Sequence, residues 1–151
     1  MPTPVRWRWL SLVLVAAACA PASRHAADEA AAMRRVLDDD TRLGGIRNHA
    51  SETKPLADAI RDYVAALDAL DFDGCPREFT DAFRRHRDAW EAAIEFFDRF
   101  RHLRGELHAL FEQLRAHDAR SKERMEAIEA AVSGTWAEVE AAVESVNEGQ
   151  R

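Results

Sequence analysis

A regular run of apolar residues between residues 79 and 100 constrains the fold more than any other feature of this chain. Its members follow alternating steps of four and three residues: Phe79, Phe83, His86, Trp90, Ala93, Phe97 and Phe100. A repeat of about 3.5 residues places all of these side chains on one face of a helix, as in the seam of a helical bundle. The pattern therefore predicts a long helix whose apolar face packs against neighbouring helices.

Three further segments are predicted to be helical. Residues 23–42 are rich in alanine, with Gly44-Gly45 expected to end that helix and residues 46–54 expected to form a polar connection. A stripe of apolar residues after Pro55 predicts the next helix: Leu56, Ile60, Tyr63, Leu67 and Leu70. The last helix carries a similar stripe: Met125, Ile128, Val132, Trp136, Val139, Val143 and Val146.

The segment around Gly105 interrupts the helical register. Arg104 takes the next seam position and Gly105 lowers helix stability, so we expect a bend or short loop before the apolar face resumes at Leu107. The fold class predicted is all-α, an antiparallel four-helix bundle in which residues 105–115 form an extra or continuing helical segment. Residues 20–151 are expected to form a single bundle domain.

The first nineteen residues have the layout of an export signal. Arg6 and Arg8 precede a short apolar run from Leu10 to Ala18, which is far shorter than the roughly 20 residues of a spanning helix. Cleavage by an ordinary signal peptidase is one interpretation, because both 16–18 and 18–20 fit its small-residue pattern. Residues 1–19 are thus predicted to be a signal peptide.

The segment Ala17-Ala18-Cys19 also resembles the cleavage box of bacterial lipoproteins, although Ala16 stands where that family usually has leucine. The resemblance implies acylation of Cys19 and a lipid anchor in a membrane. Because Ala20 is not aspartate, the resemblance also implies the outer membrane and a periplasmic location. A free periplasmic protein is the alternative.

The charge balance argues against nucleic acid as a partner. The chain has 27 acidic and 21 basic residues and a formal net charge of −6, and loss of Arg6 and Arg8 with the signal would make it more acidic. Nucleic-acid binding depends on dense patches of lysine and arginine.

His86 is the residue that breaks the apolar seam, and it is the candidate metal ligand. A histidine among aromatic residues of a bundle can ligate a metal ion or a non-covalent haem. The alternative is that it forms a hydrogen bond with a polar group on a facing helix, such as Tyr63 or Thr135. The sequence contains none of the usual motifs for covalent haem, paired metal ions, hydrolysis or nucleotide binding.

Three weaker candidates lie outside the seam. Two arginine groups are able to hold an anion: Arg84, Arg85 and Arg87, and Arg99, Arg101 and Arg104. On a continuous helix, surface metal capture is conceivable at two sets of side chains: Asp98, His102 and Glu106, and His108 with Glu112. Ordinary surface ion pairs are the alternative for all of them.

Cys75 stands at a predicted helix start before Pro76, as a protected, redox-active or dimer-forming thiol.

The functional expectation is a non-enzymatic helical protein of the cell envelope that binds a protein or a small ligand. No catalytic residue and no cofactor are predicted, and the envelope partner is not identified. The alternative function is a metal- or haem-binding periplasmic bundle that uses His86.

Overall fold

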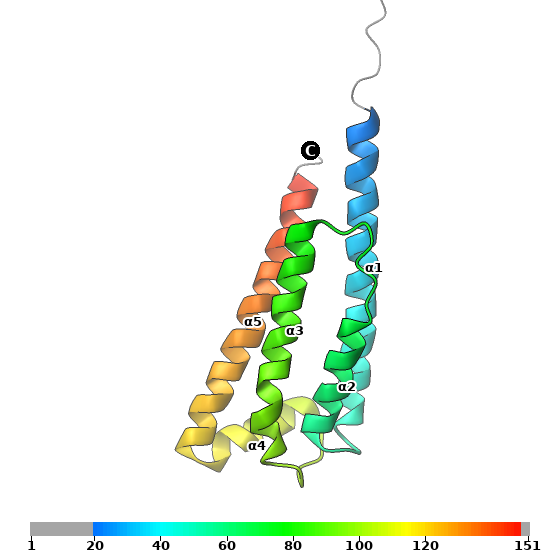
Figure 1. Ribbon diagram of the computed structural model, residues 1–151. Coiled ribbons are helices and arrows are strands. Elements are labelled where there is room, and N and C mark those ends of the chain that lie inside the picture. The colour runs from blue at the N-terminus through cyan, green and yellow to red at the C-terminus, as the bar shows by residue number, and fades with distance from the viewer. Residues whose placement is uncertain (1–19, 149–151) are drawn as a thin grey trace, which may run out of the picture.

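The computed structural model describes residues 20–148, with side chains from residue 24 onward, and this part of the chain is all-α. Its five helices pack together without strands: α1 (Ala20–Ala50), α2 (Leu56–Asp68), α3 (Arg77–Asp98), α4 (Leu107–His117) and α5 (Ala119–Glu148). Figure 1 shows α1, α2, α3 and α5 side by side, with neighbours in chain order running in opposite directions. The shorter α4 crosses the end of this bundle where α3 ends and α5 begins. The predicted signal peptide, including Cys19, lies outside the described residues.

The prediction that Gly44-Gly45 ends the first helix is wrong, because α1 continues to Ala50. Neither glycine has a positive φ, and a Cβ at Gly45 would meet nothing within 4 Å. Glycine lowers helix stability by about 1 kcal/mol relative to alanine, which tertiary packing readily offsets. Here Leu43 packs against the core and Arg47 stacks on aromatic rings of α2 and α3, so contacts on both sides hold the helix through the glycines.

Prolines mark the starts of α2 and α3. Pro55 and Pro76 occupy the N-cap positions, with φ of −52° and −58°, so α3 begins one residue later than the sequence indicated. The turn before α3 requires Gly74, whose φ is 81°, and it is closed by a 2.9 Å hydrogen bond from the Cys75 amide to the Phe72 carbonyl. Glycine adopts this conformation without steric cost.

The seam of α3 is confirmed as the centre of the core. Its apolar and aromatic members are buried: Phe79, Phe83, Trp90, Ala93, Phe97 and Phe100. The facing side chains come from every other helix, as with Met33 of α1, Ile60 of α2 and Met125 of α5. The seam thus positions α3 against its neighbours along its whole length.

The predicted break near Gly105 is also confirmed, and α4 is a separate helix. The Glu106 side chain caps α4 by accepting hydrogen bonds from the amides of His108 and Ala109. Ser51, in the connection after α1, exchanges hydrogen bonds with Gly105 and ties the two loops together. Leu110 and Leu114 then enter the core, while the Phe111 ring stacks on Phe97 at 5.8 Å. These contacts fix α4 across the end of the bundle.

Candidate functional site

The structure places His86 in the core, where both ring nitrogens have hydrogen-bond partners. Nε2 lies 3.2 Å from Trp90 Nε1, and Nδ1 lies 3.1 Å from Thr135 Oγ1 on α5. An indole N–H only donates, so Nε2 accepts and Nδ1 holds the proton of the neutral ring. Nδ1 then donates to Thr135, whose hydroxyl donates to the Ala131 carbonyl. Thr135, one of the two partners suggested from the sequence, is therefore confirmed.

The electrostatic surroundings of His86 favour the neutral ring. Burial lowers its pKa below the usual 6.5, and the positive charge of Arg47 also lowers it, against an opposing effect of Asp40. A metal ion at Nε2 would have to displace the Trp90 indole N–H. Among residues 20–148 no group of three or more His, Cys, Asp or Glu side chains is arranged to hold a metal ion. His86 as a metal ligand stays a prediction that these contacts do not favour.

A line of polar contacts continues from His86 across the bundle. The Arg47 guanidinium lies against two rings, 4.3 Å from the Trp90 centroid and 4.5 Å from the Tyr63 centroid. Tyr63 donates a 2.6 Å hydrogen bond to the buried carboxylate of Asp40. Burial and the charge of Asp40 raise the pKa of Tyr63. These groups link α1, α2, α3 and α5 through partnered polar atoms, an arrangement typical of a structural network.

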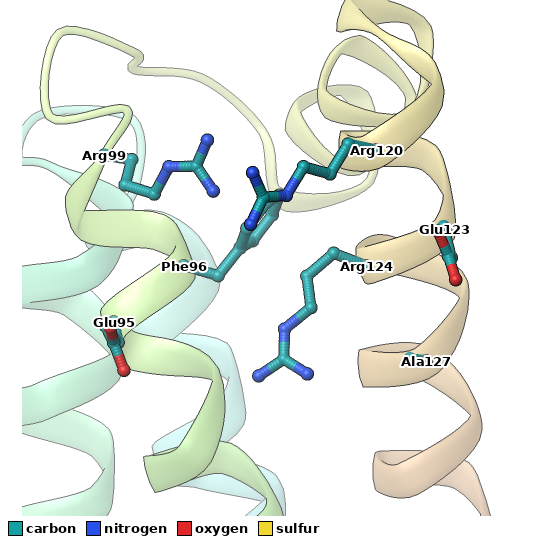
Figure 2. A pocket seen from close by; sticks show the side chains of 7 residues that line it. All are labelled: Glu95, Phe96, Arg99, Arg120, Glu123, Arg124 and Ala127. Carbon is teal, nitrogen blue, oxygen red and sulfur yellow. The ribbon is translucent and has the colours of Figure 1, made fainter.

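A second group of side chains forms a pocket where α3 ends and α5 begins, which we call the three-arginine pocket (Figure 2). Arg99 follows the last residue of α3, and Arg120 and Arg124 lie in the first two turns of α5. Their guanidinium groups point into the space between the helices, with the Phe96 ring behind them. The pocket has a volume of about 420 Å³, which is in the usual range for small-ligand sites.

These three guanidinium groups lack carboxylate partners. Within residues 24–148, no ion pair within 4.0 Å joins Arg99, Arg120 or Arg124 to an acidic group. Glu95 and Glu123 also line the pocket, but neither forms an ion pair with these arginines. Three exposed guanidinium groups therefore share one pocket, and none of them has an ion-pair partner among residues 24–148.

The other arginines named from the sequence have partners inside the protein. Arg84 pairs with Asp81 at 3.8 Å, and Arg85 with Glu138 at 2.6 Å. Arg87 contacts three carboxylates, Arg101 contacts Asp58 and Asp98, and Arg104 donates to backbone carbonyls. The ion-pair interpretation is confirmed for Arg84, Arg85, Arg87 and Arg101. Among the described residues, Arg99 and Arg104 of the two sequence groups have no carboxylate partner, and of these Arg104 donates to backbone carbonyls.

Sequence reasoning missed Arg120 and Arg124. The only signal was their spacing of four residues, which places two arginines on one face of a helix. The structure brings that face of α5 opposite Arg99, as Figure 2 shows.

The remaining sequence candidates do not converge on a site. Because α3 ends at Asp98, the set of Asp98, His102 and Glu106 does not share one helix. His108 lies 3.8 Å from Glu112 on the exposed face of α4. Cys75 is a free, half-buried thiol, and burial raises its pKa.

Comparisons with known proteins add no family to this geometry: no family model, no curated protein and no solved structure matches the chain. Among residues 20–148, every helix is too short or too polar to cross a bilayer.

Proposed function

We propose that this chain is a non-enzymatic binding protein of the cell envelope, whose three-arginine pocket holds an anion of the phosphate type. The proposed scaffold is an antiparallel four-helix bundle with α4 added across one end. One observation carries the proposal: three guanidinium groups without carboxylate partners point into one pocket of about 420 Å³. Guanidinium groups match the geometry of phosphate and carboxylate oxygens through paired N–H donors.

The charge of the whole protein makes this cluster informative. The chain has a net charge of −6, and its acidic residues neutralise most of the surface arginines. Like charges that line one pocket repel each other, so a cluster of arginines without ion pairs disfavours its own arrangement. A bound anion removes that repulsion and gains charge-assisted hydrogen bonds.

The position of the pocket favours a soluble anion over a lipid headgroup of the anchoring membrane. The proposed anchor, Cys19, immediately precedes α1 in the sequence, and α1 begins at the end of the bundle opposite the pocket. A helix of 31 residues is about 46 Å long, so the bundle separates the two ends by most of that length. The pocket would then face away from the membrane that holds the protein.

Titration calorimetry with inorganic pyrophosphate tests the binding proposal on protein recovered from cells that express the full sequence. We expect saturable 1:1 binding that weakens about tenfold in Arg124→Gln and again in Arg120→Gln, as loss of a charge-assisted contact predicts. Arg77→Gln is the matched control, because Arg77 is exposed and lies at the other end of α3. Equal affinity in Arg77→Gln and Arg124→Gln would contradict the proposal.

A second arm distinguishes the source of the anion. Vesicles of phosphatidylcholine with and without phosphatidic acid are added to the Cys19→Ala variant, which lacks the proposed acylation site. Pyrophosphate binding without capture by the acidic vesicles supports a soluble ligand. Capture that depends on Arg120 and Arg124 would instead assign the pocket to a lipid headgroup.

The envelope location has its own test. Intact-mass measurement of the membrane fraction is expected to show a chain that begins at Cys19 and carries acyl chains, and Cys19→Ala is expected to move the protein to the periplasmic fraction. An unacylated chain that begins after residue 20 would assign ordinary signal cleavage instead.

A further inference from the structure

A second cavity of about 420 Å³, open to solvent on one side, lies beside the polar network and is lined by residues of α1, α3, α4 and α5. Its walls are mainly apolar, and the large side chains that form them are Leu107, Phe111, Ile128, Val132 and Trp136. Arg47, His86 and Trp90 also line it. A mostly apolar cavity of this size with a few polar groups has the usual composition of a small-molecule site.

Most polar groups around this cavity already have an ion-pair or hydrogen-bond partner inside the protein. The Glu129 carboxylate forms an ion pair with Arg115 of α4, and the Ser133 hydroxyl donates to the Glu129 backbone carbonyl. His86 is a neutral ring with both nitrogens in hydrogen bonds. Among the lining residues, Arg47 therefore supplies the one charge that no ion pair compensates.

Several neighbours hold the Arg47 side chain in position. Its guanidinium lies against the Tyr63 and Trp90 rings and donates to the Asn48 side-chain oxygen at 3.0 and 3.1 Å. Asp40 attracts it electrostatically, but the Asp40 carboxylate accepts its hydrogen bond from Tyr63 and forms no ion pair with Arg47. Burial lowers the pKa of Arg47, against opposing effects of Tyr63 and Asp40.

We infer that this cavity binds an apolar small molecule that carries a single carboxylate, with its apolar body against α4 and α5 and its carboxylate toward Arg47. The apolar walls exclude water from the body of such a ligand. The carboxylate neutralises a half-buried guanidinium in a low-dielectric setting, where a charge pair is stronger than at the surface. This ligand chemistry differs from that of the three-arginine pocket, and the inference does not depend on that proposal.

Decanoate and decan-1-ol form a probe pair that isolates the carboxylate, because both carry the same alkyl chain. Binding is followed through the fluorescence of Trp90 and Trp136, which both line the cavity, on protein recovered from cells that express the full sequence and at concentrations below micelle formation. We expect 1:1 binding of decanoate, with decan-1-ol weaker by about tenfold because it leaves Arg47 uncompensated. Equal affinity for the two probes would overturn the inference.

Variants of Arg47 and Val132 locate the binding. Arg47→Gln is expected to lower decanoate affinity about tenfold and to leave decan-1-ol unchanged. Arg47→Lys keeps the charge but loses the planar group that lies against the rings, so we expect decanoate affinity between those of the wild-type protein and Arg47→Gln. Val132→Trp fills the cavity from α5 without altering Arg47, so it tests the site even where Arg47→Gln fails to fold. Decanoate affinity that survives Val132→Trp would overturn the inference.

The three-arginine pocket supplies the matched control. Arg124→Gln is expected to leave decanoate binding unchanged, and saturating pyrophosphate is expected not to displace decanoate. Loss of decanoate binding in Arg124→Gln would place the carboxylate in the other pocket and overturn the assignment to Arg47.

Discussion

His86 and the three-arginine pocket lie on the same pair of helices, α3 and α5, but their polar atoms are in opposite situations. Every polar atom of the His86 side chain has a partner inside the protein, in Trp90 and Thr135. The guanidinium groups of Arg99, Arg120 and Arg124 have no carboxylate partner among the described residues. The difference indicates that His86 contributes mainly to stability, while the arginines are available to a ligand.

The largest expected effect on stability comes from His86→Ala. The change opens a cavity in the core and leaves the buried Trp90 N–H without its acceptor, which together cost about 3 kcal/mol of the free energy of unfolding. Urea denaturation followed by tryptophan fluorescence measures the loss. His108→Ala is the matched control, because His108 is exposed on α4 and is expected to change little. A loss below about 1 kcal/mol in His86→Ala would contradict the conclusion that His86 contributes mainly to stability.

Tyr63→Phe extends the test along the same polar network. It leaves the buried Asp40 carboxylate without the hydroxyl that donates to it at 2.6 Å, and we expect a loss of about 2 kcal/mol. A double-mutant cycle with Asp40→Ala separates the hydrogen bond from general effects of each substitution. If the two losses simply add, the pair is not coupled and the network does not act as a unit.

The pH dependence of stability follows from the lowered pKa of His86. The unfolded chain binds a proton near the usual 6.5, while the folded chain binds it only at lower pH, so the unfolded state holds more protons between the two values. The stability contributed by the neutral ring is therefore complete at pH values above the pKa of His86 in the unfolded chain. It is lost as the pH falls toward the lower pKa of His86 in the folded protein. Urea midpoints at about pH 7.5 and about pH 5.5 measure this change.

His86→Gln is the control for the pH effect, because glutamine does not titrate. We expect the midpoint of the wild-type protein to fall more between the two pH values than that of His86→Gln. Equal falls would show that other groups produce the pH dependence, and they would argue against a neutral, fully hydrogen-bonded His86.

The sequence predicted the core better than the three-arginine pocket. The core follows from a local repeat of apolar residues, whereas the pocket depends on contacts between helices that are distant in the sequence. The seam of α3 repeats every 3.5 residues, so a local pattern determined which side chains are buried, and a facing hydroxyl such as Thr135 was a natural partner for His86. Gly44-Gly45 misled the prediction of α1 because glycine propensity is local, whereas the contacts that hold this helix come from α2 and α3.

The three-arginine pocket depends on tertiary placement that no local pattern encodes. Arg99 and Arg120 are brought together by the loop after α3, by α4 where it crosses the end of the bundle, and by the turn at Asp118, the single residue between α4 and α5. The many arginines of the chain look alike in sequence, and the structure separates them by whether a carboxylate from another helix reaches them. Arg87 meets Asp68 of α2, while Arg124 meets no such group.

The smallest expected change in stability comes from the substitution that should affect binding most. Combined replacement of Arg99, Arg120 and Arg124 by glutamine removes exposed charges that have no ion pair, so we expect the free energy of unfolding to change by less than about 0.5 kcal/mol or to rise slightly as repulsion is relieved. The same variant is expected to lose measurable pyrophosphate binding. A marked loss of stability would show that these arginines hold the ends of α3 and α5 together, in which case they resemble His86 and the contrast between the two regions fails. Stability retained together with lost binding would sharpen that contrast, because it separates the residues that maintain the bundle from those that act on a ligand.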